Sequence, residues 1–150
     1  EHLTGIQYLN FVADIYGVSA ADRDSRIQRY ADALEMTPRL NDLIGSCSHG
    51  MKQKIALISA LIHEPKILLL DEPFVGLDPK AAFTLKSIMS ELCANGSAIF
   101  FSTHVLEVAE KICNKIAIIK NGKLIAAGEM DKVKGDESLE TLFLELTDHA

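Results

Sequence analysis

Two adjacent carboxylates stand where an apolar run of the sequence ends. Residues 67–70 (ILLL) are continuously apolar, and Asp71, Glu72 and Pro73 follow them directly. Such a run is typical of a strand buried on both faces of a parallel sheet, where reactive groups sit at the carboxyl ends of strands. One reading is that Asp71 and Glu72 solvate the strand end. The other is that Asp71 holds Mg²⁺ through its water shell while Glu72 orients or deprotonates an attacking water.

A second apolar run ends in the same way. Residues 98–102 (AIFFS) predict another buried strand, and Thr103 and His104 follow it. A histidine at that point can hydrogen-bond a phosphate oxygen, or the same water from the opposite side. The alternative is a loop histidine satisfied by its neighbours. The pairing with the first strand end favours a functional role.

A third candidate is the start of a predicted helix, in residues 47–54 (CSHGMKQK). Ser48 and Gly50 there leave backbone amides and the positive end of the helix dipole facing outward, which suits a phosphate. Lys52 and Lys54 add positive charge. An ordinary N-cap at Ser48 is the alternative.

The elements that position these residues follow from periodicity and from cap and turn signals. Helical spacing comes first, then alternation of strand and helix, then a hairpin whose Asn121-Gly122 pair is a type I′ turn signal. This order predicts the α/β class, with a parallel sheet preceded by an all-helical subdomain. The expected helices cover residues 3–17, 19–36, 50–63, 78–94, 105–113 and 139–146, and the expected strands cover 67–70, 98–102, 116–119 and 123–127.

Composition narrows the class of protein. The 150 residues include 15 Lys and Arg against 21 Asp and Glu, a formal net charge of −6, and 48% are hydrophobic. This usage is that of a globular chain with a core, and it excludes a disordered or collagenous one. No basic stripe is present, which argues against a nucleic-acid partner. No apolar run is long enough to cross a bilayer.

Four motifs, in order and in register, resemble those of the ATP-binding cassette (ABC) ATPases. They are residues 48–54 (SHGMKQK), 68–73 (LLLDEP), 76–79 (GLDP) and 102–104 (STH). The similarity continues through the hairpin and the last helix, so it covers nearly the whole chain. It implies a partial P-loop NTPase-type parallel sheet. It also implies a helical subdomain with the signature motif in residues 1–63, and the Walker B and switch-histidine part of the catalytic core in residues 64–150.

The resemblance implies a role for each matched residue. Asp71 matches the Walker B aspartate on Mg²⁺, Glu72 the catalytic glutamate, and His104 the switch histidine near the γ-phosphate. The cofactors implied are therefore ATP and Mg²⁺.

The resemblance also implies partners. Ser48 and Gly50 match the signature motif, which contacts ATP held mainly by the other subunit of a head-to-tail dimer. Asp78 matches the aspartate that crosses that interface. Residues 1–45 resemble the helical subdomain that contacts a transmembrane permease. We therefore expect a second ABC ATPase subunit and a permease as partners, and a cytoplasmic protein peripheral to the inner face of the cell membrane.

Two departures from the family pattern stand out. His49 and Met51 replace a glycine and the glutamine of the common Leu-Ser-Gly-Gly-Gln signature, and similar signatures occur in exporter-type bacterial cassettes, including the Ecs-type group. No Gly-x-x-x-x-Gly-Lys-Ser/Thr phosphate loop (Walker A) occurs in the sequence. We therefore expect a C-terminal fragment of an ATPase that powers transport, inactive alone. The alternative is a cassette that binds nucleotide and regulates or docks with little turnover.

Overall fold

The computed structural model describes residues 2–148, which divide into two compact units at the boundary between Ser102 and Thr103. Helices combine with one parallel and one antiparallel strand pair, as the α/β prediction requires. The boundary between domains at residues 63 and 64 stays a prediction.

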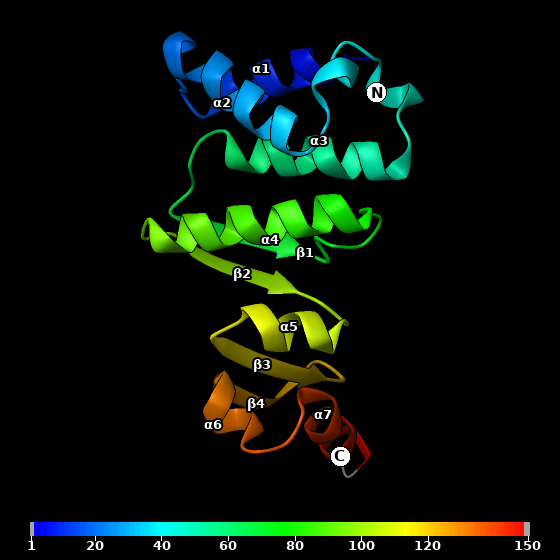
Figure 1. Cartoon of the computed structure of the whole chain (residues 1–150), viewed down its shortest axis with the longest axis vertical. Helices are drawn as coiled ribbons and strands as arrows, with labels where there is room; N and C mark the ends of the chain where they lie inside the picture. Colours follow the sequence, from blue (N-terminus) through cyan, green and yellow to red (C-terminus); the bar gives the residue numbers. More distant parts are fainter. Residues whose placement is uncertain (1, 149–150) are drawn as a thin grey trace. The chain divides into compact units, whose positions relative to one another are not determined.

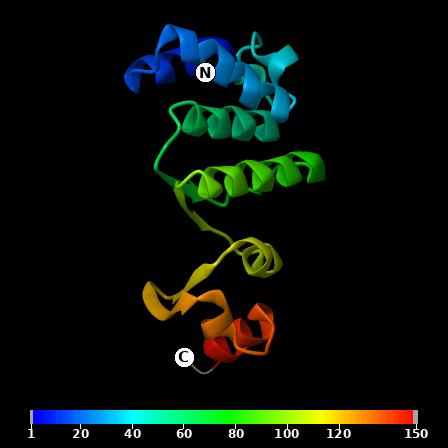
Figure 2. The same cartoon turned by 60° about the vertical axis from the view of Figure 1, so that its left-hand side comes forward.

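The first unit begins with three helices, α1 (Gly5–Ile15), α2 (Ala20–Ala33) and α3 (His49–Leu61). Figures 1 and 2 both show α1 and α2 side by side against α3, and these helices contact one another in pairs. Two short 3₁₀ turns, η1 (Thr37–Arg39) and η2 (Ile44–Ser46), fill the break before α3. The core between the helices is aliphatic with one tyrosine, and it includes Leu9, Ile27, Tyr30, Leu34, Ile55 and Ile58.

The end of α2 differs from the expectation of a helix reaching Met36. The helix ends at Ala33, Glu35 takes a left-handed backbone with φ +58°, and the Met36 amide returns to the Ala31 carbonyl at 2.7 Å. Met36 is buried all the same. Its apolar side chain therefore satisfies the helical period although its backbone has left the helix.

A strand, a helix and a second strand complete the first unit. They are β1 (Ile67–Asp71), α4 (Pro79–Ala94) and β2 (Ala98–Ser102). The strands pair in parallel from Ile67 opposite Ala98 to Asp71 opposite Ser102, and α4 packs along them (Figure 1). The predicted start of α4 at Asp78 and Pro79 and its end at Ala94 are confirmed.

The expectation that β1 and β2 are buried strands is wrong, because one face of each is exposed. Side chains alternate along the pair, so Leu68 is buried while Ile67 and Leu69 are 70% and 72% exposed. Phe100 of β2, on the same face as Leu69, is 63% exposed. The described part of the chain therefore covers one face of the strand pair and leaves an apolar face open.

The second unit is built on a hairpin of β3 (Lys115–Lys120) and β4 (Lys123–Glu129). Asn121 and Gly122 both have positive φ, +50° and +75°, which confirms the predicted type I′ turn. Three helices accompany the hairpin: α5 (Leu106–Ile112), α6 (Met130–Lys134) and α7 (Leu139–Asp148). Its buried core consists of Ala109, Ile118, Met130 and Leu139.

Candidate functional site

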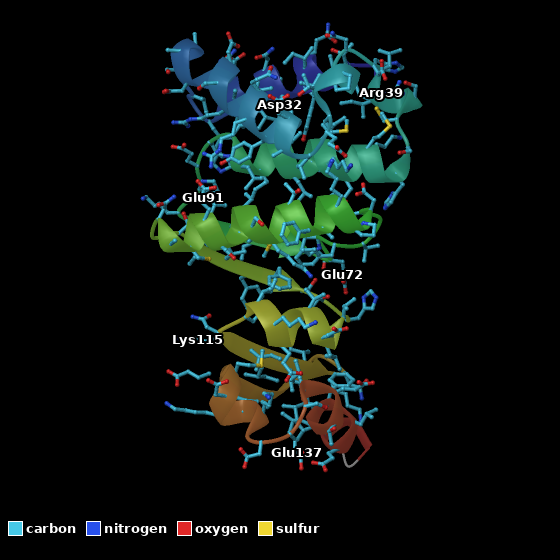
Figure 3. The ribbon with its side chains drawn as sticks, in the orientation of Figure 1. Asp32, Arg39, Glu72, Glu91, Lys115 and Glu137 are labelled. Atoms are coloured by element: carbon cyan, nitrogen blue, oxygen red, sulfur yellow. The ribbon has the colours of Figure 1, made fainter. Side chains whose placement is uncertain are left out.

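The carboxyl ends of β1 and β2 meet, as the sequence predicts, and bring Asp71 and Glu72 beside Ser102. The Ser102 hydroxyl donates a hydrogen bond to Asp71 Oδ1. The Glu72 amide donates to Ser102 Oγ at 3.1 Å and to the Ser102 carbonyl at 3.2 Å. The Asp71 side chain is exposed at this edge and Glu72 is half-buried, and Figure 3 labels Glu72 there.

Glu72 has an unusual backbone. Its φ of +44° is in the left-handed region, which a residue with a Cβ rarely adopts and which costs about 1–2 kcal/mol. The chain turns sharply at this point, because the Val75 amide donates back to the Glu72 carbonyl at 3.1 Å. The turn takes the chain out of the sheet at once, and the bonds to Ser102 hold Glu72 in place.

The loop that follows ends at Asp78, which anchors it twice. Asp78 Oδ1 accepts from the Ala81 amide at 2.9 Å, which is the N-cap bond of α4. Asp78 Oδ2 receives Lys54 Nζ from α3 at 3.0 Å. The Ala81 amide, and then Lys54, hold the pKa of the Asp78 carboxyl below its usual value. The Lys54 side chain is only 13% exposed, and it pairs with the loop of its own chain.

The start of α3 packs against the same loop. A Cβ at Gly50 would lie 2.7 Å from the Gly76 carbonyl oxygen, and a Cβ at Gly76 would lie 2.9 Å from the His49 ring. Gly76 also has φ +79°. Position 50 must therefore be glycine for α3 to approach the loop this closely, a reason that does not involve a ligand.

Ser48 is the N-cap of α3, and its hydroxyl oxygen accepts from the Met51 amide at 3.3 Å. This bond uses the oxygen as an acceptor and leaves the hydroxyl proton available as a donor. Ser48 is exposed, at the positive end of a 13-residue helix. The cap and the predicted phosphate contact are therefore compatible.

His104 belongs to the second unit and is exposed. The Val105 amide beside it donates to Thr103 Oγ1 at 3.0 Å, which shapes the turn into α5. The structure thus brings Asp71, Glu72 and Ser102 together, and Ser48, Gly50 and Asp78 around one loop. The predicted place of His104 beside the water stays a prediction.

Sequence reasoning missed three contacts at the site: Ser102 with Asp71, Lys54 with Asp78, and His49 with Gly76. The first had a signal, because aligning the two strands by their last apolar residues places Ser102 opposite Asp71. The other two contacts join segments more than 20 residues apart, and no local sequence pattern predicts them.

A cavity of about 380 Å³ in the first unit lies away from these residues. Arg26 and Arg29 line it and are already paired, with Glu64 at 3.0 Å and with Glu91 at 2.5 Å. A smaller cavity of about 190 Å³ touches Asp71. This smaller cavity therefore reaches the carboxyl end of β1.

Among residues 2–148, no group of three or more His, Cys, Asp or Glu side chains could together hold a metal ion. No helix in that part of the chain is long and apolar enough to cross a membrane.

Comparisons with known proteins agree with the motifs. The model of the family described as "AAA domain, putative AbiEii toxin, Type IV TA system" matches residues 21–110. The ABC-type transporter ATP-binding protein EcsA of Bacillus subtilis is 35% identical over 152 residues, covering 98% of this chain and 62% of EcsA. An uncharacterized ABC transporter ATP-binding protein of Nostoc sp. is 34% identical over 140 residues, 92% of this chain and 42% of that protein.

A solved structure of the ATP-binding subunit of an ABC transporter matches with a TM-score of 0.94 and 36% identity, over 98% of this chain and 63% of that one. The match confirms the predicted P-loop NTPase-type α/β fold. The chain therefore belongs to the family of this AAA-domain model, and it is part of an ABC ATPase domain. It spans between 42% and 63% of the length of these relatives.

Proposed function

We propose that this chain supplies the Walker B and signature parts of an ATP-hydrolysing subunit that powers a membrane transporter. The observation that carries the proposal is the pair of carboxylates at the end of β1, joined to β2 through Ser102, in a chain that matches ABC ATP-binding proteins throughout. ABC ATPases bind ATP with Mg²⁺. The relatives' names support transport as the purpose of that hydrolysis.

Asp71 fits a magnesium ion bound together with a nucleotide. Mg²⁺ is usually held by one or two carboxylates plus substrate phosphates and waters, and Asp71 offers an exposed carboxylate at the carboxyl end of a strand. When bound, the ion supplies positive charge against the phosphates. Asp71 has the role of orienting it, with the Ser102 hydroxyl holding the carboxylate in place.

Glu72 and His104 are the proposed catalytic residues. Phosphoryl transfer requires mainly positioning and electrostatic stabilisation, so the catalytic side chain must face the water from a fixed backbone. The hydrogen-bonded left-handed turn at Glu72 meets this need. His104 is proposed to contact the γ-phosphate or the same water.

Ser48, Gly50 and Asp78 are proposed to face the ATP or the interface of a second ABC ATPase subunit in a head-to-tail dimer. Ser48 has a hydroxyl proton and a helix N-terminus to offer. Gly50 allows close backbone approach, and Asp78 is exposed.

The helical part is proposed to dock on a transmembrane permease, which would place the protein on the inner face of the cell membrane. Nucleic acid is not a proposed partner.

The test is Glu72→Gln in the complete polypeptide that carries this sequence. ATP turnover should fall at least about 100-fold, because the amide cannot accept the proton of water. Retained ATP binding, measured by calorimetry, serves as the control that the site still forms. Undiminished turnover would remove Glu72 from the mechanism. The 150-residue chain alone, with no phosphate loop, should show no turnover.

A second candidate is a cassette that binds nucleotide and regulates or docks. It is favoured by the altered signature, in which His49 and Met51 replace a glycine and the glutamine of the common form. Steady-state ATPase activity measured with the membrane partner distinguishes the two. Turnover stimulated by that partner supports the transporter ATPase, and a lack of turnover supports the regulator.

A further inference from the structure

The Ser102 hydroxyl bridges two neighbouring groups, as a donor to one and an acceptor from the other. A serine hydroxyl has one proton to donate and two lone pairs to accept with. Here the proton goes to Asp71 Oδ1, and a lone pair receives the Glu72 amide at 3.1 Å. Because the single proton is committed to the carboxylate, the lone pairs are turned toward the amide. One side chain thus fixes both a carboxylate and the backbone of the next residue.

The backbone of Glu72 needs such a partner. A left-handed non-glycine residue persists only where its surroundings hold it, and φ at Glu72 is +44°. The hold comes from Ser102 through both its hydroxyl and its carbonyl, at 3.1 and 3.2 Å. The strand register supplies the geometry, since Ser102 lies directly opposite Asp71.

We propose that Ser102 is a positioning residue for ATP hydrolysis, which orients the Asp71 carboxylate toward the metal and sets the direction of the Glu72 side chain. The inference rests on the proposed function. Ser102 contacts no reacting atom in this role and acts through Asp71 and Glu72. Groups that orient metal-binding carboxylates in this way typically change activity or metal affinity about 10- to 100-fold when they are removed.

The sharpest test compares Ser102→Thr with Ser102→Val in the complete polypeptide. The two variants have nearly the same shape, suit a strand equally, and differ in the hydroxyl alone. We expect the threonine variant to keep most of the activity. The valine variant, and likewise Ser102→Ala, should lower kcat about 10-fold and raise the Mg²⁺ concentration for half-maximal turnover, with KM for ATP changed less than about twofold.

Ser97→Ala is the matched control. Ser97 also bonds across the strand pair, through Oγ to the Pro65 carbonyl at 2.8 Å, but at the end far from the carboxylates. Its loss should leave kcat and the Mg²⁺ dependence unchanged. A readout independent of turnover is amide hydrogen exchange at Glu72, which should speed up in the valine variant and stay slow in the threonine and Ser97→Ala variants.

Equal kcat and equal Mg²⁺ dependence in the threonine and valine variants would overturn the inference. So would a Ser97→Ala effect as large as that of Ser102→Val, because the role would then be structural. Both results leave the proposed function intact as long as the unsubstituted protein turns over ATP and Glu72→Gln abolishes the turnover. If the unsubstituted protein shows no turnover, the proposed function itself fails.

Discussion

Gly50 determines how closely helix α3 can pack against the loop at Gly76. The space beside its Cα is filled by the Gly76 carbonyl oxygen, 2.7 Å from where a Cβ would stand. Real Cβ atoms do not approach an oxygen so closely, and the obstacle is backbone and cannot rotate away. Glycine is therefore needed at this position whether or not a phosphate is ever bound.

Gly50→Ala should lower the free energy of unfolding by about 1–3 kcal/mol, because α3 or the loop must move to admit the methyl group. Urea denaturation of the chain measures it. Ser59→Ala is the control: it places the same side chain on the same helix and gives up only a bond to the Ala56 carbonyl within the helix. An unchanged midpoint for Gly50→Ala would show that the loop yields freely.

Residue types at the site could be predicted from the sequence because each motif is local. Asp71 and Glu72 were identified from the apolar run before them, and Ser48 from the helix after it. The contacts between motifs could not be predicted, because the Lys54 and Asp78 side chains meet only once α3 and the loop have packed. The sequence therefore shows where the candidate residues stand in the elements, but not which side chains each of them contacts.

At the scale of elements, α4 depends on Asp78 for both its start and its link to α3. The carboxylate caps the helix through the Ala81 amide and pairs with Lys54, and both contacts favour the ionised form. Because its pKa is lowered in the folded state, this group stabilises the fold above the ordinary carboxyl value of 3.8. The stabilisation is lost as the pH falls through the lower folded value.

Asp78→Ala should therefore lower Tm at pH 7, and the difference from the unsubstituted chain should shrink as the pH falls below 3.8. Thermal melts followed by circular dichroism from pH 7 to pH 3 measure the difference. Asp78→Ser is the matched control, since a serine still caps a helix but carries no charge that titrates. A Tm difference that stays constant over this pH range would contradict the assigned cause.

The sequence predicts the bounds of an element well where a cap or turn residue marks its end, and poorly where no such residue is present. The proline and aspartate at the start of α4, and the Asn-Gly turn between β3 and β4, each fix a backbone conformation by their own chemistry. Helix α6 was missed because five residues are too few to show a period. The prediction that β1 is buried on both faces was wrong. An apolar run shows that its side chains favour burial, but it does not show whether another part of the chain covers them.

At the scale of the whole chain, the open apolar face of the β1 and β2 pair is the main departure from an ordinary surface. Ile67, Leu69 and Phe100 are each at least 63% exposed and lie together on one face. Exposed patches of large apolar side chains favour association, and each of the two strands also has an edge that pairs with no other strand among the described residues.

The chain alone should therefore self-associate as its concentration rises, and Leu69→Lys should reduce the association. Sedimentation velocity over a range of concentrations measures it. Phe83→Lys is the control, because Phe83 is also 72% exposed but lies on α4, outside the strand face. A chain that stays monomeric throughout, or an equal effect of both lysines, would show that the open face is not responsible.

The close contact of Gly50 with Gly76, together with the pair of Lys54 and Asp78, has a kinetic consequence. Helix α3 packs directly against the backbone of the loop from Glu72 to Asp78 at Gly50, and the Lys54–Asp78 ion pair links the two at a second point. Neither element can therefore shift far without the other. Their slow motions should share one exchange rate, and the signature residues and Glu72 would then reach or leave their working positions in a single step.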